Sequence, residues 1–157
     1  MKKRIGIIIV AITLLIFPAN VLAADTEQST PSIISLEDGS YFTVVIEDEN
    51  TSSNITLYST SVTKSKTYTY YNSKGTKQWY IKVTGTFTYG NGTSKCNSSS
   101  VSAKSYVNAW KITSKSSSKS GKTAIAKSTA KQYYNGTVIN TINETVKLTC
   151  SSTGKFS

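Results

Sequence analysis

The stretch QWYIKVTGTFTY at residues 78–89 decides the fold class of this chain. Its large apolar side chains recur at alternate positions, and most of the positions between them hold Lys or Thr. The apolar members are Trp79, Ile81, Val83, Phe87 and Tyr89. Because successive side chains of a β-strand point to opposite faces, this period of two predicts a strand with one face in a core and the other in water.

Two turn signals predict hairpins around this strand. Residues 64–71 also alternate, and the NSKG loop at 72–75 joins them to the strand predicted at 78–89. Further on, Asn135-Gly136 stands between two more strand-like stretches. Asn-Gly readily adopts the two positive φ angles of a type I′ turn, whose twist matches that of paired strands. Residues 123–134 and 137–150 should therefore be adjacent antiparallel strands.

The rest of the domain has the same character. From residue 55 onward the chain is rich in Thr, Ser, Lys, Tyr and Val, with further turn signals at 90–92 and 118–121 and no helical periodicity. We therefore expect an all-β fold, a small antiparallel β-sandwich of six or seven strands, Ig-like in size and connected mostly as a meander.

The first 23 residues have the pattern of a secretory signal peptide. Positive residues at 2–4 precede an apolar run at 5–17, and Val21 and Ala23 are small enough for a cleavage site before Ala24. An uncleaved anchor is the alternative, but the run is shorter than the ~20 residues that a span needs. We expect a secreted protein, extracellular or associated with the cell surface.

Charge divides the remaining chain into two parts. Residues 24–49 hold seven acidic groups and no basic one, whereas residues 50–157 hold fifteen lysines and one acid, Glu144. We expect residues 24–54 to form an acidic flexible arm with a possible short strand at 41–46, able to lie over the lysines of a basic domain at 55–157. Lysine presents a hydrated point charge, which suits attraction to an anionic polymer.

Two cysteines, Cys96 and Cys150, stand in the basic domain. In an exported protein the default expectation for such a pair is one intramolecular disulfide. By strand parity Cys150 shares a face with Val146 and Leu148, which would place its sulfur in the core. A bond closing a loop of this length would stabilise the fold by roughly 4 kcal/mol.

Several stretches of the basic domain resemble a family of small secreted proteins of unknown function from Gram-positive, clostridia-like bacteria. They are residues 75–89, 94–96, 110–112, 131–139 and 148–150. The likeness covers roughly residues 55–157. It implies export and paired cysteines, and it carries over no catalytic or binding residue.

The side chains that catalysis usually needs are scarce. The chain has no His, which excludes Ser-His-Asp and Cys-His arrangements, and a paired-carboxylate glycosidase would need a second acid beside Glu144 in the domain. The parity of Glu144 matches the core, so we expect either a bulge that turns it outward or a place near the exposed end of its strand. A Ser-Lys hydrolase is the one remaining enzymatic alternative, and we expect no enzyme.

Metal and nucleotide motifs are incomplete. Two sulfurs are too few for a structural zinc site, and the oxygen-rich loop at 48–54 lacks the Gly and Glu of a calcium loop. The sequence SGKT at 120–123 ends like a phosphate-binding loop but lacks its first Gly. We expect no cofactor, no metal and no nucleotide.

Surface charge then indicates binding as the function. We expect a non-catalytic protein whose Lys-rich strands attract an anionic cell-envelope polymer or lipid headgroups; export makes nucleic acid an incidental ligand. The candidate binding residues are Lys111, Lys115, Lys119, Lys122, Lys127, Lys131 and Tyr133. The alternatives are a carbohydrate-binding module that uses outward Tyr and a secreted antibacterial or membrane-active protein. Lysines that only confer solubility and tyrosines that only stabilise the sheet remain the plainer interpretations.

Overall fold

A computed structural model describes residues 31–49, 54–55 and 58–157 of the chain. The expected signal peptide and the start of the acidic arm lie outside these residues. Every regular element in the described part is a β-strand, and nothing there is a helix long and apolar enough to cross a membrane. The all-β prediction is confirmed.

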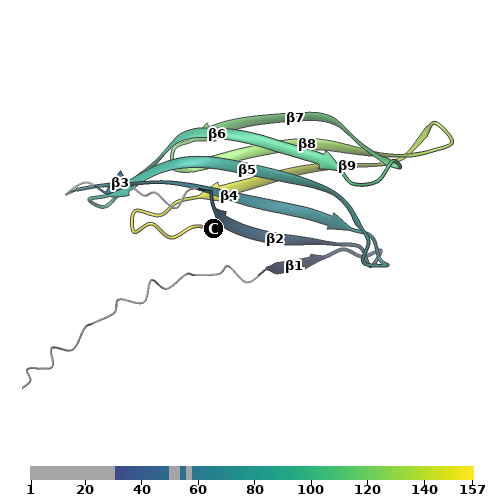
Figure 1. Ribbon diagram of the computed structural model, residues 1–157, viewed down its shortest axis with the longest axis horizontal. Helices are drawn as coiled ribbons and strands as arrows, with labels where there is room; N and C mark the ends of the chain where they lie inside the picture. The colour runs from purple at the N-terminus through teal and green to yellow at the C-terminus, as the bar shows by residue number, and fades with distance from the viewer. Residues whose placement is uncertain (1–30, 50–53, 56–57) are drawn as a thin grey trace, which may run out of the picture.

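The strands form two antiparallel sheets. Sheet A has the order β1-β2-β4-β5-β6, with β3 paired to β4 at one end, and sheet B has the order β7-β8-β9 (Figure 1). The strands of sheet A are β1 (Ser32–Ser35), β2 (Tyr41–Asp48), β3 (Asn54–Ile55), β4 (Thr60–Tyr71), β5 (Lys77–Gly90) and β6 (Thr93–Ser105). Those of sheet B are β7 (Trp110–Ser120), β8 (Thr123–Tyr134) and β9 (Thr137–Thr149).

The connections follow the predicted meander. The expected hairpins are present as β4–β5 and β8–β9, and Asn135 and Gly136 adopt φ angles of 47° and 80° at the second turn. Nine strands are seen where six or seven were expected. The short β1 and β3 account for the difference, because two to four residues are too few to show a period of two.

Sheet A includes part of the segment that was expected to be an arm. β2 pairs along its whole length with β4, and Phe42 and Val44 of β2 are buried. β1 pairs with β2 at the edge of the sheet, and all four of its side chains are exposed. The first 18 residues of the described part therefore contribute to the core as well as to the acidic charge.

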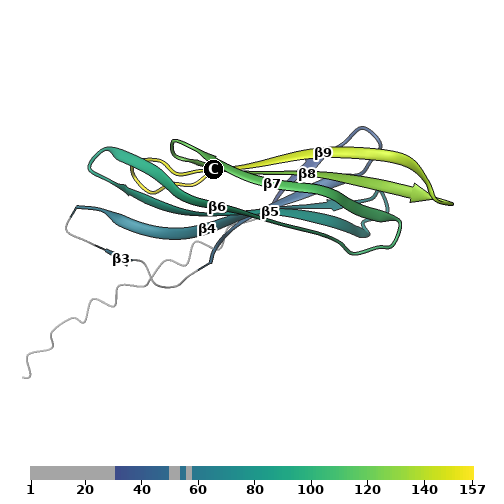
Figure 2. The same ribbon diagram turned by 90° about the horizontal axis from the view of Figure 1, so that it is seen from above.

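The two sheets lie one above the other as two layers (Figure 2) and share one apolar core. As the alternation predicts, Trp79, Ile81, Val83 and Phe87 of β5 are fully buried. They face the small side chains of Ala124, Ala126 and Ala130 in β8, which let the layers approach closely there, as well as Val146 and Leu148 in β9. At Gly85 the approach is so tight that a Cβ atom would lie 2.8 Å from the Cβ of Ala124.

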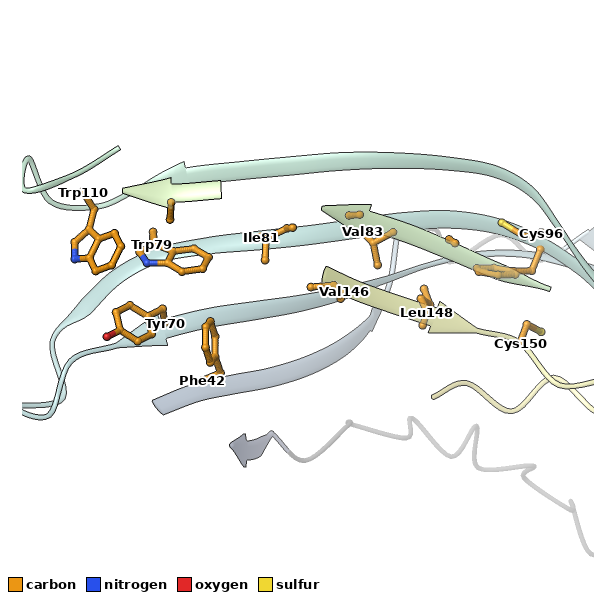
Figure 3. Close-up of a cluster of buried hydrophobic side chains, with 14 residues drawn as sticks. Phe42, Tyr70, Trp79, Ile81, Val83, Cys96, Trp110, Val146, Leu148 and Cys150 are labelled. Atoms are coloured by element: carbon orange, nitrogen blue, oxygen red, sulfur yellow. The ribbon is translucent and has the colours of Figure 1, made fainter. Parts of the chain in front are cut away.

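The core is differentiated along its length. Figure 3 shows Phe42, Tyr70, Trp79 and Trp110 at one end of it and the two cysteines at the other. Ring centroids in the aromatic group lie between 5.2 and 6.1 Å apart, with tilted or edge-on planes, which is the geometry that aromatic quadrupoles favour.

The predicted disulfide is wrong. Cys96 and Cys150 are buried free thiols, one in β6 of sheet A and the other just after β9 of sheet B. Each Sγ donates instead to a nearby backbone carbonyl, Cys96 to Ser98 at 3.1 Å and Cys150 to Ser151 at 3.3 Å. The backbone N–H groups of Cys96 and Cys150 donate to the carbonyls of Gly121 and Lys122 in the β7–β8 turn. Strand parity says only that both sulfurs face inward, and it does not bring them within bonding distance. Burial raises the pKa of both thiols, which keeps them protonated.

Candidate binding surface

The outer face of sheet B carries a group of lysines. Ala124, Ala126 and Ala130 of β8 point into the core, so the residues between them point outward. Those outward residues include Lys127 and Lys131, and the register places further lysines beside them on both neighbouring strands. The resulting group, which we call the lysine face, consists of Lys111, Lys127, Lys131 and Lys147.

Cross-strand register shows how the lysine face is assembled. Lys111 of β7 lies directly opposite Lys131 of β8. Lys147 of β9 lies opposite Ile125, which is the outward residue of β8 next to Lys127. Three of the six predicted lysines are therefore brought together, and Lys147 joins them although the sequence analysis omitted it. Its distance along the chain concealed its position on the same face.

A β-bulge separates the other predicted lysines from the lysine face. The register of β7 and β8 shifts between Ile112 and Ser114, so Thr113 is the extra residue. One extra residue moves every later side chain to the opposite face. Lys115 and Lys119 consequently lie opposite the buried residues Ser128 and Ala124.

The two displaced lysines still lie at the exposed edge of β7. Lys119 Nζ donates a hydrogen bond to the carbonyl oxygen of Asn97 in β6, so it links the two sheets. Lys122 lies in the β7–β8 turn. The predicted set thus divides into three lysines on the face, two at the edge and one at the end of the hairpin.

Tyr133 is next to the lysine face. Its ring centroid lies 5.0 Å from Lys111 Nζ, which is a cation–π contact. Its backbone N–H donates to the carbonyl of Ala109 at 2.7 Å, which holds the end of β8 against the β6–β7 connection. Tyr133 therefore helps to orient Lys111.

Apart from Glu144 of β9, the carboxylates of the described residues lie away from sheet B. Asp48 pairs with Lys64 at 2.8 Å and Glu49 pairs with Lys82, and all four residues belong to sheet A or its margin. These acids of the expected arm neutralise sheet A, and none of the described ion pairs involves the lysine face. The lysine face therefore makes no ion pair among the described residues, and Glu144, the carboxylate side chain on β9, has the opposite parity.

Glu144 keeps the parity of the core. It pairs with Ser128 in regular register and is half-buried, so it is neither turned outward by a bulge nor placed at the end of its strand, as the sequence analysis expected. Burial raises the pKa of this carboxyl, and the N–H of Thr145, which donates to it at 3.1 Å, opposes the shift. The pKa of the Tyr68 hydroxyl is also raised, first by the burial of Tyr68 itself and then by the nearby charge of Glu144.

A shallow hollow of about 290 Å³ lies on sheet B beside these residues. Its lining includes Lys115, Lys127, Thr129 and Asn143, as well as Glu144. Thr129 Oγ1 donates to Asn143 Oδ1 at 2.8 Å and so is fixed in place. Lys115 and Lys127 have opposite parities, and the carboxyl of Glu144 also lines the hollow, so the hollow is not part of the lysine face.

A second surface lies on the outer face of sheet A. Tyr41 and Tyr71 stack with centroids 4.9 Å apart, and Tyr80 contacts Tyr106 at 5.7 Å. Lys77 Nζ lies 5.0 Å from the centre of the Tyr106 ring. As alternation along the strand predicts, Tyr80 points outward whereas the adjacent Trp79 is buried.

In the described ranges there is no cluster of three or more His, Cys, Asp or Glu side chains that could hold a metal ion. Comparison with known proteins finds no matching family model, no matching curated protein and no matching solved structure. The geometry of the two surfaces is thus the basis for the functional interpretation.

Proposed function

We propose that this is an exported, non-catalytic protein that binds the phosphate groups of an anionic cell-envelope polymer or lipid headgroup through its lysine face. One observation carries the proposal: Lys111, Lys127, Lys131 and Lys147 share one face of a rigid sheet while the described ion pairs are confined to sheet A. Charges that take part in no described ion pair are available to an external anion.

The distribution of charge favours this function over mere solubility. A soluble surface usually mixes both signs, whereas here the described acids other than Glu144 stand on β2 and the loops beside it. Focusing one sign on one face raises the local concentration of an oppositely charged polymer and speeds association.

The test uses protein recovered from the medium of a secreting Gram-positive host and purified wall teichoic acid as the phosphate polymer. One variant replaces the four lysines of the lysine face with Gln. A matched variant replaces four other exposed lysines with Gln: Lys74, Lys95, Lys104 and Lys155. Both variants lose the same net charge, so the comparison isolates position from total charge.

We expect the lysine-face variant to bind about a thousandfold more weakly at low salt, since each of the four lysines near an anionic surface contributes ~1 kcal/mol. The matched variant should bind nearly like the parent protein. Affinity of the parent should fall as salt rises and the Debye length shortens to about 8 Å at physiological ionic strength. An equal loss in both variants would refute a dedicated face, and binding unaffected by salt would refute the electrostatic mechanism.

The tyrosine surface supports a second candidate, a carbohydrate-binding function. Tyr80 and Tyr106 present ring surface next to Lys77, and aromatic rings can stack on sugar rings. Such binding would withstand salt and would be lost in a Tyr80→Ala/Tyr106→Ala variant. Binding of a neutral cell-wall glycan with those two properties would favour this candidate.

A further inference from the structure

The β8–β9 hairpin extends beyond the other strands at one end of the molecule (Figures 1 and 2). Its end carries three large side chains that face solvent: Tyr134 is 67% exposed, Val138 42% and Ile139 57%. We call these three residues the hairpin tip. Val and Ile on an exposed strand end contribute nothing to the core, so their exposure calls for another explanation.

The backbone beneath the hairpin tip is well defined. Asn135 and Gly136 form the tight turn, and Tyr134 pairs with Thr137 immediately before and after it. A β-bulge follows at the point where Tyr133 pairs with Val138 but Gln132 pairs with Asn140, so Ile139 is the extra residue. Because the turn and bulge already define the backbone of this segment, binding through it requires little further ordering of the chain.

The hairpin tip is continuous with the lysine face. Val138 lies opposite Tyr133, whose ring contacts Lys111. Lys131 stands two residues before Tyr133 on the same strand. The apolar side chains thus stand near the projecting turn of the hairpin, and Lys111 and Lys131 stand next to them on the side of the main body of the sheet. This order matches a lipid bilayer surface, where an apolar interior lies behind a layer of phosphate groups.

We propose that the hairpin tip anchors the protein in an anionic lipid bilayer. Tyr134, Val138 and Ile139 would enter the region where the headgroups meet the acyl chains, and Lys111 and Lys131 would contact lipid phosphates. This inference rests on the proposed function, and of the two ligands named there it selects lipid headgroups. A soluble phosphate polymer has no apolar phase for Val138 and Ile139, whereas a bilayer offers one. Tyrosine is also suited to the boundary between headgroups and hydrocarbon.

The main experiment measures partitioning of the secreted protein onto vesicles of phosphatidylglycerol and phosphatidylcholine, and its binding to wall teichoic acid. The test variant is Val138→Ser/Ile139→Ser. The matched control is Ile33→Ser/Ile34→Ser on β1, where the side chains are 66% and 43% exposed but belong to sheet A. Circular dichroism confirms that each variant is folded.

We expect the tip variant to partition onto vesicles at least about tenfold more weakly, because two aliphatic side chains no longer enter the bilayer. Its binding to teichoic acid should be unchanged, and the β1 control should match the parent protein in both assays. A tip variant that partitions like the parent protein would overturn the anchor. Failure of the proposed function is a separate result, in which the lysine-face variant binds teichoic acid as tightly as its matched control.

A spectroscopic variant tests insertion directly. Trp79 and Trp110 are buried, so a Tyr134→Trp variant adds one exposed indole at the hairpin tip. Its added emission should shift to the blue on anionic vesicles and be quenched by nitroxide-labelled lipid. Emission that stays water-like on bound vesicles would contradict insertion of the tip.

Discussion

Gly85 is the position at which a single added methyl group should be felt most strongly. An ideal Cβ there would lie 2.6 and 2.7 Å from Cε2 and Cζ of Phe87 and 2.8 Å from the Cβ of Ala124. Ordinary van der Waals contacts of a Cβ begin at 3.4 Å, so all three distances are too short by more than half an ångström. Phe87 cannot easily withdraw, because it is fully buried and packs edge-on against Phe156 at 5.2 Å.

The cost of Gly85→Ala follows from two opposing effects. Overpacking of a dense core destabilises by about 1 to 3 kcal/mol, and contacts this short with a ring and with the opposite sheet suggest the upper part of that range. Loss of glycine's freedom in the unfolded chain offsets about 0.4 to 1 kcal/mol. We therefore expect a net loss of about 2 kcal/mol, which for a chain of this size lowers Tm by about 4 to 8 °C.

Thermal and urea unfolding of parent protein, Gly85→Ala, Phe87→Leu and the double variant measure this effect. Leu in place of Phe87 removes the ring atoms nearest to the added methyl group. The double variant should therefore be more stable than the sum of the single losses predicts, by about 1 kcal/mol. Unchanged or increased stability of Gly85→Ala, or strictly additive losses, would refute close approach of the sheets at this point.

Three further predictions concern the core. Alkylation of the unfolded, unreduced protein should modify both Cys96 and Cys150, while the native protein reacts slowly because both thiols are buried; a mass that corresponds to a disulfide would contradict this. Glu144→Gln should raise Tm more at pH 7 than at pH 4. The raised pKa of Glu144 means that the native state holds this proton more tightly than the unfolded chain does, so the parent protein loses stability as pH rises from the ordinary pKa of 4.5 through the native pKa. A gain in Tm that is independent of pH would argue against burial as the cause. Phe156→Ala should cost about 2 kcal/mol in urea unfolding because its half-buried ring packs on Phe87, and an unchanged midpoint would show that the C-terminal segment is not part of the core.

The local pattern of the chain predicted much of the fold. Alternation at Trp79 and Tyr80 assigned one side chain to the core and its neighbour to the surface, and Asn135-Gly136 located the β8–β9 turn. Such features are decided within a few residues, because the pleat has a period of two and a type I′ turn needs two particular φ angles. That is why the all-β class and the two main hairpins could be predicted.

The candidate site could be predicted only in part. Counting parity from Lys111 would place Lys115 and Lys119 on the same face, but the bulge at Thr113 moves them to the opposite one. Lys147 joins the lysine face from a different strand. A bulge arises from the fit between two paired strands, and a shared face arises from their register, so neither can be obtained from one strand alone.

The sequence by itself determined the all-β class, the strand parities and the excess of lysine over acid, since each depends on residue type and local spacing. Only the tertiary structure decided that β1 and β2 join sheet A, that Cys96 and Cys150 remain free thiols and that four lysines gather on sheet B beside an exposed hairpin tip. These outcomes depend on which strands pair and how two sheets stack. Contacts between residues far apart in the chain decide them. The alternation along one strand cannot, because it is the same whichever strand or sheet becomes its neighbour.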